Sequence, residues 1–364
     1  MKICFVLPTV DMSGGIKVVS IYAKMLTAKG HEVVLVSPPE RELSFRQKLK
    51  YFLRGRGWPQ IKPIKSHLND LMLNHTVLEQ YRPVTNTDLP DADVVIATWW
   101  ETAEWVNALD RSKGAKVYFI QHHEVFDYLP VARSAATYRL PLHKIVIARW
   151  LLDVMRDEYG DNNVDLVPNS VDKKQFYADL RGKQPVPTVG FLFSYAEFKG
   201  VDVTLKAIGK LKETIPNLRI ISFGAFKPDT FPTWDNSIDF YYSPAQDTIR
   251  DLYAQCDVWV TASRSEGFNL PAMEAMACRT PIVSTKAGWP MEAIRSNENG
   301  ILTEIDDVEA LTDGAKWVLS LNEDHWKTLS LNAYETLSES TWEHSADLFE
   351  KALNNAISIT NQHG

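Results

Sequence analysis

Residues 258–284 read V-W-V-T-A-S-R-S-E-G-F-N-L-P-A-M-E-A-M-A-C-R-T-P-I-V-S. Two short apolar runs, V-W-V-T and P-I-V-S, enclose a loop and a helical segment, which predicts a β-loop-α-β unit. Asn269 is a residue type that caps helices, and Pro271 stands where proline starts them well. The backbone amides of residues 267–270 are then unpaired at a helix N-terminus, where they suit an anion or a hydroxyl-rich ligand.

The same alternation of apolar runs and helical segments extends in both directions along the chain. Apolar runs typical of buried parallel strands occur at residues 2–8, 31–37, 93–98, 116–120, 144–148, 188–193, 218–223 and 238–241. Helical periodicity predicts helices at residues 16–29, 199–214 and 270–278, and from Val308 to near Ile357. Together these patterns predict an α/β fold with two doubly wound halves and a helical tail.

Length and linker composition suggest where the domains end. The chain has 364 residues, which indicates two domains at roughly 150 residues each. The stretch R-G-K-Q-P-V-P at residues 181–187 has the composition of a linker. We therefore expect a first domain at residues 1–180, completed by a C-terminal helix at about 342–364, and a second domain at residues 184–341.

Composition and charge exclude several classes of protein. Hydrophobic residues make up 45% of the chain and charged residues 23%, so the chain is not largely disordered. A net charge of −7 argues against a partner that is a nucleic acid. Three scattered cysteines form neither a disulfide framework nor a zinc site, and no apolar run reaches the roughly 18 residues of a membrane span. We expect a cytoplasmic protein, either free or peripheral on the inner face of the membrane.

One segment differs in charge from the rest of the chain. Residues 40–67 hold eight Lys or Arg and two Glu, a net charge of +6. Within this segment, Phe45, Leu49 and Phe52 lie on one face of a predicted helix. Residues 44–54 are therefore either a basic amphipathic helix that contacts an anionic membrane, or a solvated helix whose apolar face packs on the domain.

The segment 266–283 resembles the signature of family 4 glycosyltransferases, retaining enzymes of the GT-B fold, which reads E-G-F-G-L-P-x-x-E-A-M-A-x-G-x-P-V-V. The matching residues are Glu266, Gly267, Phe268, Leu270, Pro271, Glu274, Ala275, Met276, Ala277, Pro281 and Val283. Asn269 and Arg279 stand where the family usually has glycine. The resemblance implies two Rossmann-like domains facing each other across a cleft, with a C-terminal helix that returns to the first domain.

The resemblance also implies an activity. A chain of this kind moves a hexosyl group with retention from a nucleoside diphosphate sugar to a glycan or lipid-linked acceptor, in cell-surface polysaccharide synthesis, with no cofactor and no metal required. The alternatives are a nucleotide-sugar epimerase or phosphorylase on the same scaffold, and a non-catalytic nucleotide-sugar binding protein. A nicotinamide-dependent oxidoreductase is disfavoured, because no G-x-G-x-x-G follows the first strand. Asp91-Ala92-Asp93 imitates a D-x-D metal element, but it lies in a turn before a strand.

Carried over residue by residue, the resemblance assigns the donor site. Glu266 is the catalytic residue that contacts hydroxyls of the donor sugar, and Glu274 holds the ribose hydroxyls. The loop amides that assist them belong to Gly267, Phe268, Asn269 and Leu270. Lys199, in G-F-L-F-S-Y-A-E-F-K-G, matches the lysine that neutralises the diphosphate; the alternative is an ordinary lysine at a helix start. The arginine of that element is missing, since Phe191, Phe193 and Ser194 occupy its positions, and Arg264 is the candidate replacement.

Two histidines and two glycines in the first half are further candidates. Either His122 or His123, in Y-F-I-Q-H-H-E-V-F, corresponds to the family's histidine that faces the donor sugar, unless both are structural. Gly14 and Gly15 match the family's glycine loop after the first strand, where backbone approaches a phosphate or the acceptor. They are equally compatible with a plain tight turn.

Trp99 and Trp100 follow the apolar run at residues 93–98. Carboxyl ends of parallel strands are where ligands bind in open α/β sheets. These tryptophans are therefore either a platform for an acceptor sugar or, as for many aromatic residues, anchors of a helix start in the core.

Overall fold

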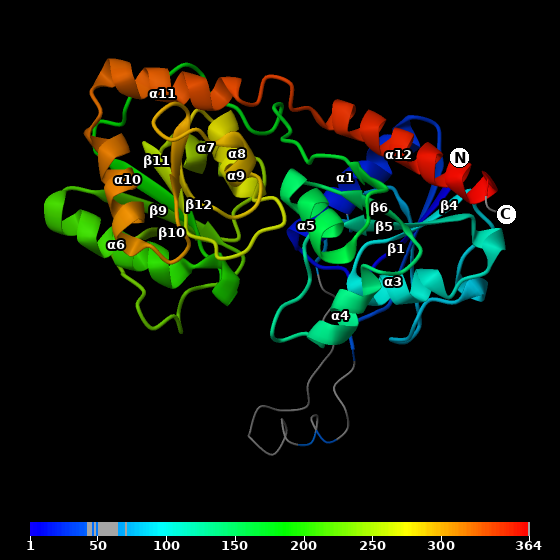
Figure 1. Cartoon of the computed structure of the whole chain (residues 1–364). Helices are drawn as coiled ribbons and strands as arrows, with labels where there is room; N and C mark the ends of the chain where they lie inside the picture. The colour runs from blue at the N-terminus through cyan, green and yellow to red at the C-terminus, as the bar shows by residue number, and fades with distance from the viewer. Residues whose placement is uncertain (42–45, 47–48, 50–64, 70, 363–364) are drawn as a thin grey trace. The chain divides into compact units, whose positions relative to one another are not determined.

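The computed structural model describes residues 1–41, 46, 49, 65–69 and 71–362 (Figure 1). The predicted basic helix at residues 44–54 lies outside the described residues, apart from positions 46 and 49. Contacts between Cα atoms divide the chain into two units. Unit 1 comprises Met1–Ile147, Leu151–Val167 and Ala346–Gly364, and unit 2 comprises Ala148–Trp150 and Pro168–Ser345.

Unit 1 is built on a parallel sheet with the strand order β3-β2-β1-β4-β5-β6-β7. Its strands are β1 Lys2–Val6, β2 Glu32–Ser37, β3 Asn74–Val77, β4 Val94–Ala97, β5 Ala115–Ile120, β6 His143–Val146 and β7 Val164–Leu166. Its helices include α1 Gly14–Ala28, α3 Trp100–Asn107, α4 Val131–Thr137, α5 Arg149–Tyr159 and α12 Trp342–Gln362. All four residues of the central strand β4 are buried, as expected where helices cover both faces of a parallel sheet.

Unit 2 repeats this plan with the strand order β10-β9-β8-β11-β12-β13, again parallel. Its strands are β8 Thr188–Leu192, β9 Arg219–Gly224, β10 Asp239–Tyr242, β11 Val258–Thr261, β12 Ile282–Thr285 and β13 Gly300–Thr303. Its helices include α6 Val201–Thr214, α7 Ile249–Ala254, α8 Leu270–Ala277, α9 Pro290–Ala293, α10 Val308–Ser320 and α11 Glu323–Glu335. Figure 1 shows α6 and α10 on one face of this sheet and α7, α8 and α9 on the other.

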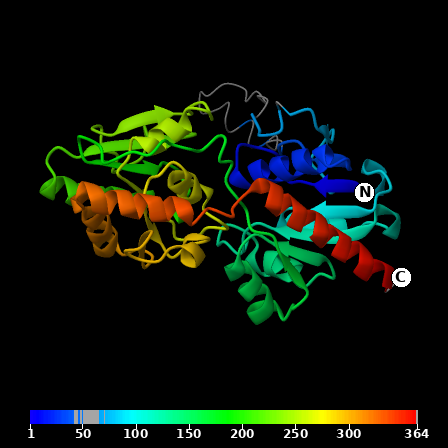
Figure 2. The same cartoon turned by 90° about the horizontal axis from the view of Figure 1, so that it is seen from above.

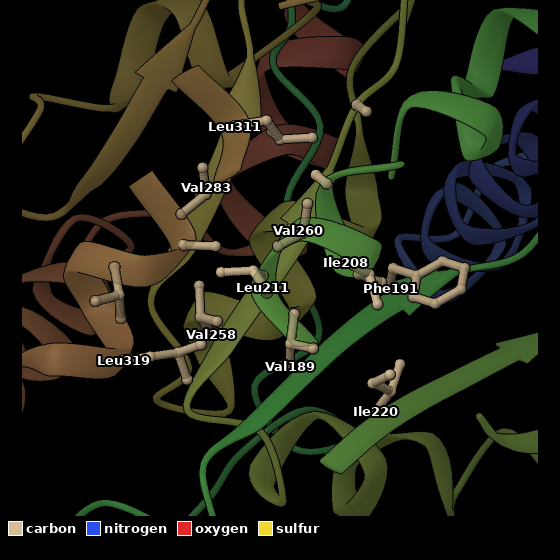
Figure 3. Packing of buried hydrophobic residues seen from close by; sticks show 14 of the residues in the cluster. Val189, Phe191, Ile208, Leu211, Ile220, Val258, Val260, Val283, Leu311 and Leu319 are labelled. Atoms are coloured by element: carbon tan, nitrogen blue, oxygen red, sulfur yellow. The ribbon is translucent and has the colours of Figure 1, made fainter. Parts of the chain in front are cut away.

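The core of unit 2 lies between its sheet and the helices α6 and α10. Val189 and Phe191 of β8 pack with Ile208 of α6 and Leu311 of α10, and all four are at least 98% buried (Figure 3). Burying side chains of this size contributes about 1.5–3 kcal/mol each relative to exposing them. This core fixes β8 against α6, and the loop that joins them carries Lys199.

Three strands, β3, β7 and β13, have no counterpart among the strands expected from the sequence. Each lies at an edge of its sheet. Residues of β3 are half-buried or exposed, and β7 has only three residues, all half-buried. An edge strand is covered less than a central one, so it lacks the continuous apolar run by which buried strands are recognised.

The helix after β1 begins earlier than expected. The glycines Gly14 and Gly15 were expected in a turn before a helix starting at Ile16, but α1 begins at Gly14. The turn lies just upstream, where the side chain of Asp11 accepts a hydrogen bond from the backbone N of Ser13 at 2.9 Å. An aspartate that bonds the backbone two residues on closes such a turn without glycine.

The helix α12 completes unit 1. Phe349 is fully buried, and its ring lies 4.4 Å from the ring of Tyr22 in α1 and 5.0 Å from that of Phe119 in β5. Lys29 pairs with Asp347 and Glu350 of the same helix. Figure 2 shows α12 (red) running beside the N-terminal strand and helix (blue). The return of the C-terminal helix to the first domain, expected from the resemblance, is confirmed.

The strand order of each sheet reverses direction once. The reversal falls between β1 and β4 in unit 1, and between β8 and β11 in unit 2. At such a point the loops leaving the carboxyl ends of two adjacent strands diverge, and a ligand crevice forms there. In unit 2 these are the loops that carry Lys199 and Glu266, which places both residues at the reversal point.

Candidate functional site

A cluster of polar side chains lies where β8 and β11 end in unit 2. Lys199 Nζ lies 2.7 Å from Oε1 of Glu266, and the hydroxyl of Ser263 donates to the same oxygen at 2.7 Å. The side chain of Glu266 is only 9% exposed. Two donors therefore hold one carboxylate oxygen of a nearly buried glutamate, so the carboxylate is fixed before any ligand arrives.

Gly200 makes the approach of Lys199 to this cluster possible. Its φ is +62°, in the left-handed region, and a Cβ at this position would overlap the carbonyl oxygen of Ala262. Only glycine combines that backbone conformation with so close an approach of two chain segments. Lys199 and Gly200 thus mark the point at which the loop after β8 contacts the end of β11.

Lys199, Glu266 and Asn269 line one small hollow of about 20 Å³ in unit 2. The hollow lies at the end of β11 and has room for about one water molecule. The structure thereby brings together three of the residues that the sequence assigns to the donor site. Their roles in binding the donor stay a prediction.

Asn269 and Arg279 stand where the related signature has glycine, and both have positive φ, +77° and +60°. Asparagine tolerates the left-handed region better than most residues, whereas arginine does so at a cost of about 1–2 kcal/mol. The side chain of Asn269 does not cap α8 as the sequence suggested; instead its Nδ2 donates to Oγ1 of Thr261 at 3.1 Å. Arg279 is held by stacking on Tyr334, with its guanidinium carbon 4.1 Å from the ring centre.

Glu274 lies inside α8 and is 7% exposed. Oη of Tyr253 donates to its Oε2 at 3.0 Å. Burial, followed by the charge of Glu274, raises the pKa of Tyr253 well above its ordinary value, so the phenol keeps its proton and remains a donor. Tyr253 is a residue that the sequence reasoning missed, because it lies in α7 and no spacing links it to α8.

Gly288 is a second residue that the sequence reasoning missed. Its φ is +71°, and a Cβ at this position would lie 2.8 Å from Cβ of Glu266 and from the carbonyl oxygen of Phe268. The next residue, Trp289, donates its backbone N–H to that oxygen at 2.8 Å and stacks its ring on Phe268. The loop after β12 therefore packs against the Glu266–Phe268 loop and supports it. Its only trace in the sequence is one isolated glycine.

Arg264, the candidate replacement for the missing arginine, is engaged within unit 2. Its Nη1 and Nη2 bond the two carboxylate oxygens of Asp202 at 3.0 and 2.9 Å, and its Nε bonds Asp306 at 2.7 Å. Nη1 also donates to the backbone carbonyl of Glu197 at 2.8 Å. These bonds connect the end of β11 to the first turn of α6, so Arg264 stabilises the local structure of unit 2. Its role as a diphosphate ligand stays a prediction.

The two histidines after β5 have different surroundings in unit 1. Nε2 of His123 lies 2.7 Å from Oη of Tyr159, and its ring packs against Tyr138 and Tyr159. Burial lowers the pKa of His123, so its imidazole is neutral at pH 7. The ring of His122 lies 4.8 Å from Phe126. Nδ1 of His122 lies 3.1 Å from the carbonyl oxygen of His123, so both histidines have partners within unit 1. Which of them faces a donor sugar stays a prediction.

Gly14 and Gly15 form the first turn of α1 in unit 1. A Cβ at Gly14 would meet nothing within 4 Å, and one at Gly15 would touch the side chain of Gln121 at an ordinary 3.6 Å. The fold therefore does not require glycine at either position. The contact of these glycines with a phosphate or the acceptor stays a prediction.

Trp100 and Trp99 lie at the start of α3 in unit 1. Trp100 is 3% exposed, and its backbone N–H donates to Oε2 of the buried Glu124 at 2.8 Å. Burial raises the pKa of Glu124 well above its ordinary value. Trp100 thus anchors the start of the helix, which is one of the two alternatives that the sequence left open. Both tryptophans also line a hollow in unit 1.

The described residues also bear on metal sites and on membrane spans. Residues 1–41, 65–69 and 71–362 contain no group of three or more His, Cys, Asp or Glu side chains placed to hold a metal ion. Over the same part of the chain, every helix is too short or too polar to cross a membrane.

Residues 173–336, nearly all of unit 2, match the family model described as "Glycosyl transferases group 1". An uncharacterized glycosyltransferase of Methanocaldococcus jannaschii is 28% identical over 204 residues, which cover 55% of this chain and 56% of that protein. The chain spans about half the length of the curated relatives it matches. The signature that carries Glu266 and Glu274 lies within the matched segment.

Two solved structures share the architecture of the chain. Sucrose-phosphate synthase from Thermosynechococcus elongatus matches with a TM-score of 0.74 at 16% identity, over 99% of this chain and 100% of that chain. The Anabaena HepE protein in complex with UDP matches with a TM-score of 0.73 at 16% identity, over 98% and 100%. The fold is GT-B, with two Rossmann-like α/β domains, and this expectation from the sequence is confirmed.

Proposed function

We propose that the chain is a retaining glycosyltransferase that moves a hexosyl group from a nucleoside diphosphate sugar to a glycan or lipid-linked acceptor. One observation carries this proposal: Glu266 is fixed by Lys199 and Ser263 at the strand-order reversal of unit 2, inside the segment that matches group 1 glycosyl transferases. Two matches support it: a GDP-mannose-dependent alpha-mannosyltransferase of Corynebacterium glutamicum is 26% identical over 229 residues, and HepE was solved in complex with UDP.

The residues of unit 2 suit the departure of a diphosphate. In the proposed step, the bond between C1 of the sugar and the diphosphate oxygen breaks, and its electron pair leaves with the diphosphate. The oxygen of an acceptor hydroxyl bonds C1 on the same face, and its proton passes to the departing phosphate. Lys199 and the amides of residues 267–270 stabilise the negative charge that develops, while Glu266 positions the sugar hydroxyls. We propose that these groups suffice without a metal ion.

The acceptor and the site of action belong to the same proposal. We place the acceptor beside Trp99 and Trp100, and we place the protein in the cytoplasm, peripheral on the inner face of the membrane through residues 44–54. A role in cell-surface polysaccharide synthesis would bring a lipid-linked acceptor to that surface. Cosedimentation with anionic vesicles tests the membrane contact, and an absence of binding at low salt contradicts it.

Binding and turnover of nucleotide sugars test the central proposal. UDP- and GDP-linked hexoses are screened by calorimetry, and transfer to glycan acceptors is followed by mass spectrometry with EDTA present. We expect binding of one donor class and transfer that EDTA does not abolish. The anomeric configuration of the product, read by NMR, shows whether transfer proceeds with retention.

Glu266→Gln separates catalysis from binding. We expect this variant to keep nucleotide affinity within about threefold and to lose at least about 100-fold in transfer rate, the usual effect of removing one such polar group. Glu335→Gln, on the exposed side of α11, is the matched control and should transfer at the normal rate. Unchanged transfer by Glu266→Gln overturns the assigned role, and epimerisation or phosphorolysis without transfer overturns the proposed activity.

A further inference from the structure

Unit 1 contains a hollow of about 530 Å³ at the carboxyl ends of β1 and β4. Four aromatic side chains, two of them the tryptophans at the start of α3, and two arginines contribute to its lining. They are Tyr81, Trp99, Trp100, Tyr128, Arg41 and Arg133. A volume of this size accommodates one or two sugar rings.

Arg41 is held in place over an aromatic ring. Its guanidinium carbon lies 4.3 Å from the ring centre of Tyr81, and its Nη2 donates to Tyr81 Oη at 3.0 Å and to Glu101 Oε1 at 2.7 Å. Tyr81 Oη in turn donates to Oε2 of Glu101 at 2.9 Å. Both hydrogen bonds of Arg41 use Nη2. Within the described residues, the N–H groups on Nε and Nη1 make no such bond, so they can donate to a ligand.

Arg133, which lies in α4, is held in a similar way. Its guanidinium carbon lies 5.2 Å from the ring centre of Trp100. Nε and Nη2 bond the two carboxylate oxygens of Glu104 at 2.8 and 2.5 Å. Within the part of the chain that the structure describes, its Nη1 makes no such bond. Both arginines are thus oriented by a carboxylate of α3 and an aromatic face, while more than half of each side chain is exposed.

We infer that this hollow is an acceptor subsite that selects a saccharide bearing an anionic group, a carboxylate or a phosphate. The inference rests on the proposed glycosyltransferase function and names the chemical class of its acceptor. Aromatic rings pack against the C–H faces of sugars, and guanidinium groups bind carboxylate and phosphate oxygens with directed N–H pairs.

The placement of charge favours an anion over a neutral sugar. The lining holds two guanidinium groups against one carboxylate, Glu101, and that carboxylate is already bonded by Arg41 and Tyr81. Glu104, which orients Arg133, is not part of the lining. An anionic substituent therefore meets N–H groups of two guanidinium groups that carboxylates of α3 hold in place, and this ordering in advance reduces the entropy lost on binding.

A matched pair of ligands tests the inference on the full chain. Trigalacturonic acid and its neutral methyl ester have the same sugar and linkage and differ in charge, and glucose 6-phosphate against glucose supplies the phosphate comparison. We expect the charged member of at least one pair to bind about tenfold more tightly by calorimetry, and the difference to shrink between 50 and 300 mM salt. The pair that shows the difference identifies the anion as carboxylate or phosphate.

Substitutions locate the binding. Arg41→Gln and Arg133→Gln should each weaken binding of the charged ligand about five- to tenfold and leave the neutral one unchanged. Arg111→Gln, an exposed arginine outside the hollow, is the control and should bind like the parent. Equal binding within both pairs, no binding by either charged ligand, or full binding by both arginine variants overturns the inference.

The two proposals fail separately. UDP and GDP binding is measured on the same samples, and the arginine variants should bind the nucleotide as the parent does, because both arginines lie in unit 1. If acidic saccharides bind but no nucleotide sugar is bound or turned over, the proposed function falls and the saccharide site stands. If nucleotide sugars are turned over while charge makes no difference to saccharide binding, the proposed function stands and the anionic acceptor subsite is wrong.

Discussion

Nζ of Lys199 lies 2.7 Å from Oε1 of Glu266, so the cation proposed to meet the diphosphate is paired with the carboxylate proposed to meet the sugar. A charge-assisted bond between partly buried groups is strong, and removing one partner leaves the other uncompensated. A donor that binds here has to replace the bond with contacts of its own. The pair therefore keeps both groups in place while the site is unliganded.

Substitution of Lys199 tests this relationship. Lys199→Met removes the cation while keeping an unbranched side chain, and we expect donor affinity to fall at least tenfold and transfer about 100-fold. Lys199→Arg should recover part of both, because it restores the charge. Lys206→Met, an exposed lysine on α6, is the control. An ordinary helix-start lysine at position 199 would instead leave affinity and transfer at parent values.

The left-handed residue before α8 gives a prediction about stability. Asn269→Ala should lower the free energy of unfolding by about 1–2 kcal/mol, because alanine tolerates a φ of +77° poorly. Asn269→Gly should stay within about 1 kcal/mol of the parent, since glycine adopts that conformation freely and only the bond to Thr261 is lost. Chemical denaturation measures both. Equal stability of the two variants would show that backbone conformation at this position carries no cost.

Two roles are open to Arg264: the diphosphate ligand that the sequence predicts, and a stabilising role suggested by its bonds within unit 2, which gives the expectation stated here. Arg264→Gln breaks the bonds to Asp202, Asp306 and the carbonyl of Glu197, and we expect a loss of roughly 1–3 kcal/mol in unfolding free energy. Donor affinity, measured at a temperature where the variant is folded, should change less than threefold. If affinity falls tenfold with the unfolding transition unmoved, Arg264 is a diphosphate ligand instead.

Glu124 makes the stability of unit 1 depend on pH. Its pKa in the folded state is raised above the ordinary value of 4.5, chiefly by burial. Below 4.5 the carboxyl is protonated in both states and costs nothing. As pH rises above 4.5 the unfolded chain releases the proton first, so the folded state loses stability until its own pKa is passed.

Glu124→Gln removes that dependence. We expect its melting temperature relative to the parent to rise between pH 5 and pH 8 by at least about 2 °C, the shift that roughly 1 kcal/mol produces in domains of this size. Glu79→Gln, an exposed glutamate of unit 1, serves as the comparison and should give a constant difference. Parallel melting curves for Glu124→Gln and the parent across this range would contradict the prediction.

The central strands, and the placement of Glu266 and Glu274 in one loop and the helix that follows it, were predictable from the sequence. Buried strands such as β4 and β11 consist of continuous apolar runs, and the spacing of Glu266 and Glu274 is local to one loop and helix. The partners of those glutamates were not predictable. Tyr253 and Gly288 reach them from elements that are adjacent only after folding, and one side-chain bond or one missing Cβ leaves no periodic trace.

The two positions that flank α8, Asn269 and Arg279, show the same limit. The sequence shows that Asn269 and Arg279 stand where the family usually has glycine. It does not show that both residues have a left-handed backbone conformation. Arg279 in particular is compensated by Tyr334, which lies in another helix. A sequence pattern records which residue type is usual, whereas the stacking that permits an unusual one depends on the tertiary structure.

The position of Phe349 in the core of unit 1 has a consequence for synthesis on the ribosome. Chains are made from the N-terminus, and N-terminal domains usually fold first. Here residues 1–167 are made before Phe349, whose ring packs against Tyr22 and Phe119. Unit 2, apart from Ala148–Trp150, is one unbroken segment, Pro168–Ser345, that ends before Phe349. All segments of unit 2 are thus made before unit 1 is complete, because unit 1 depends on residues that follow unit 2 in the chain.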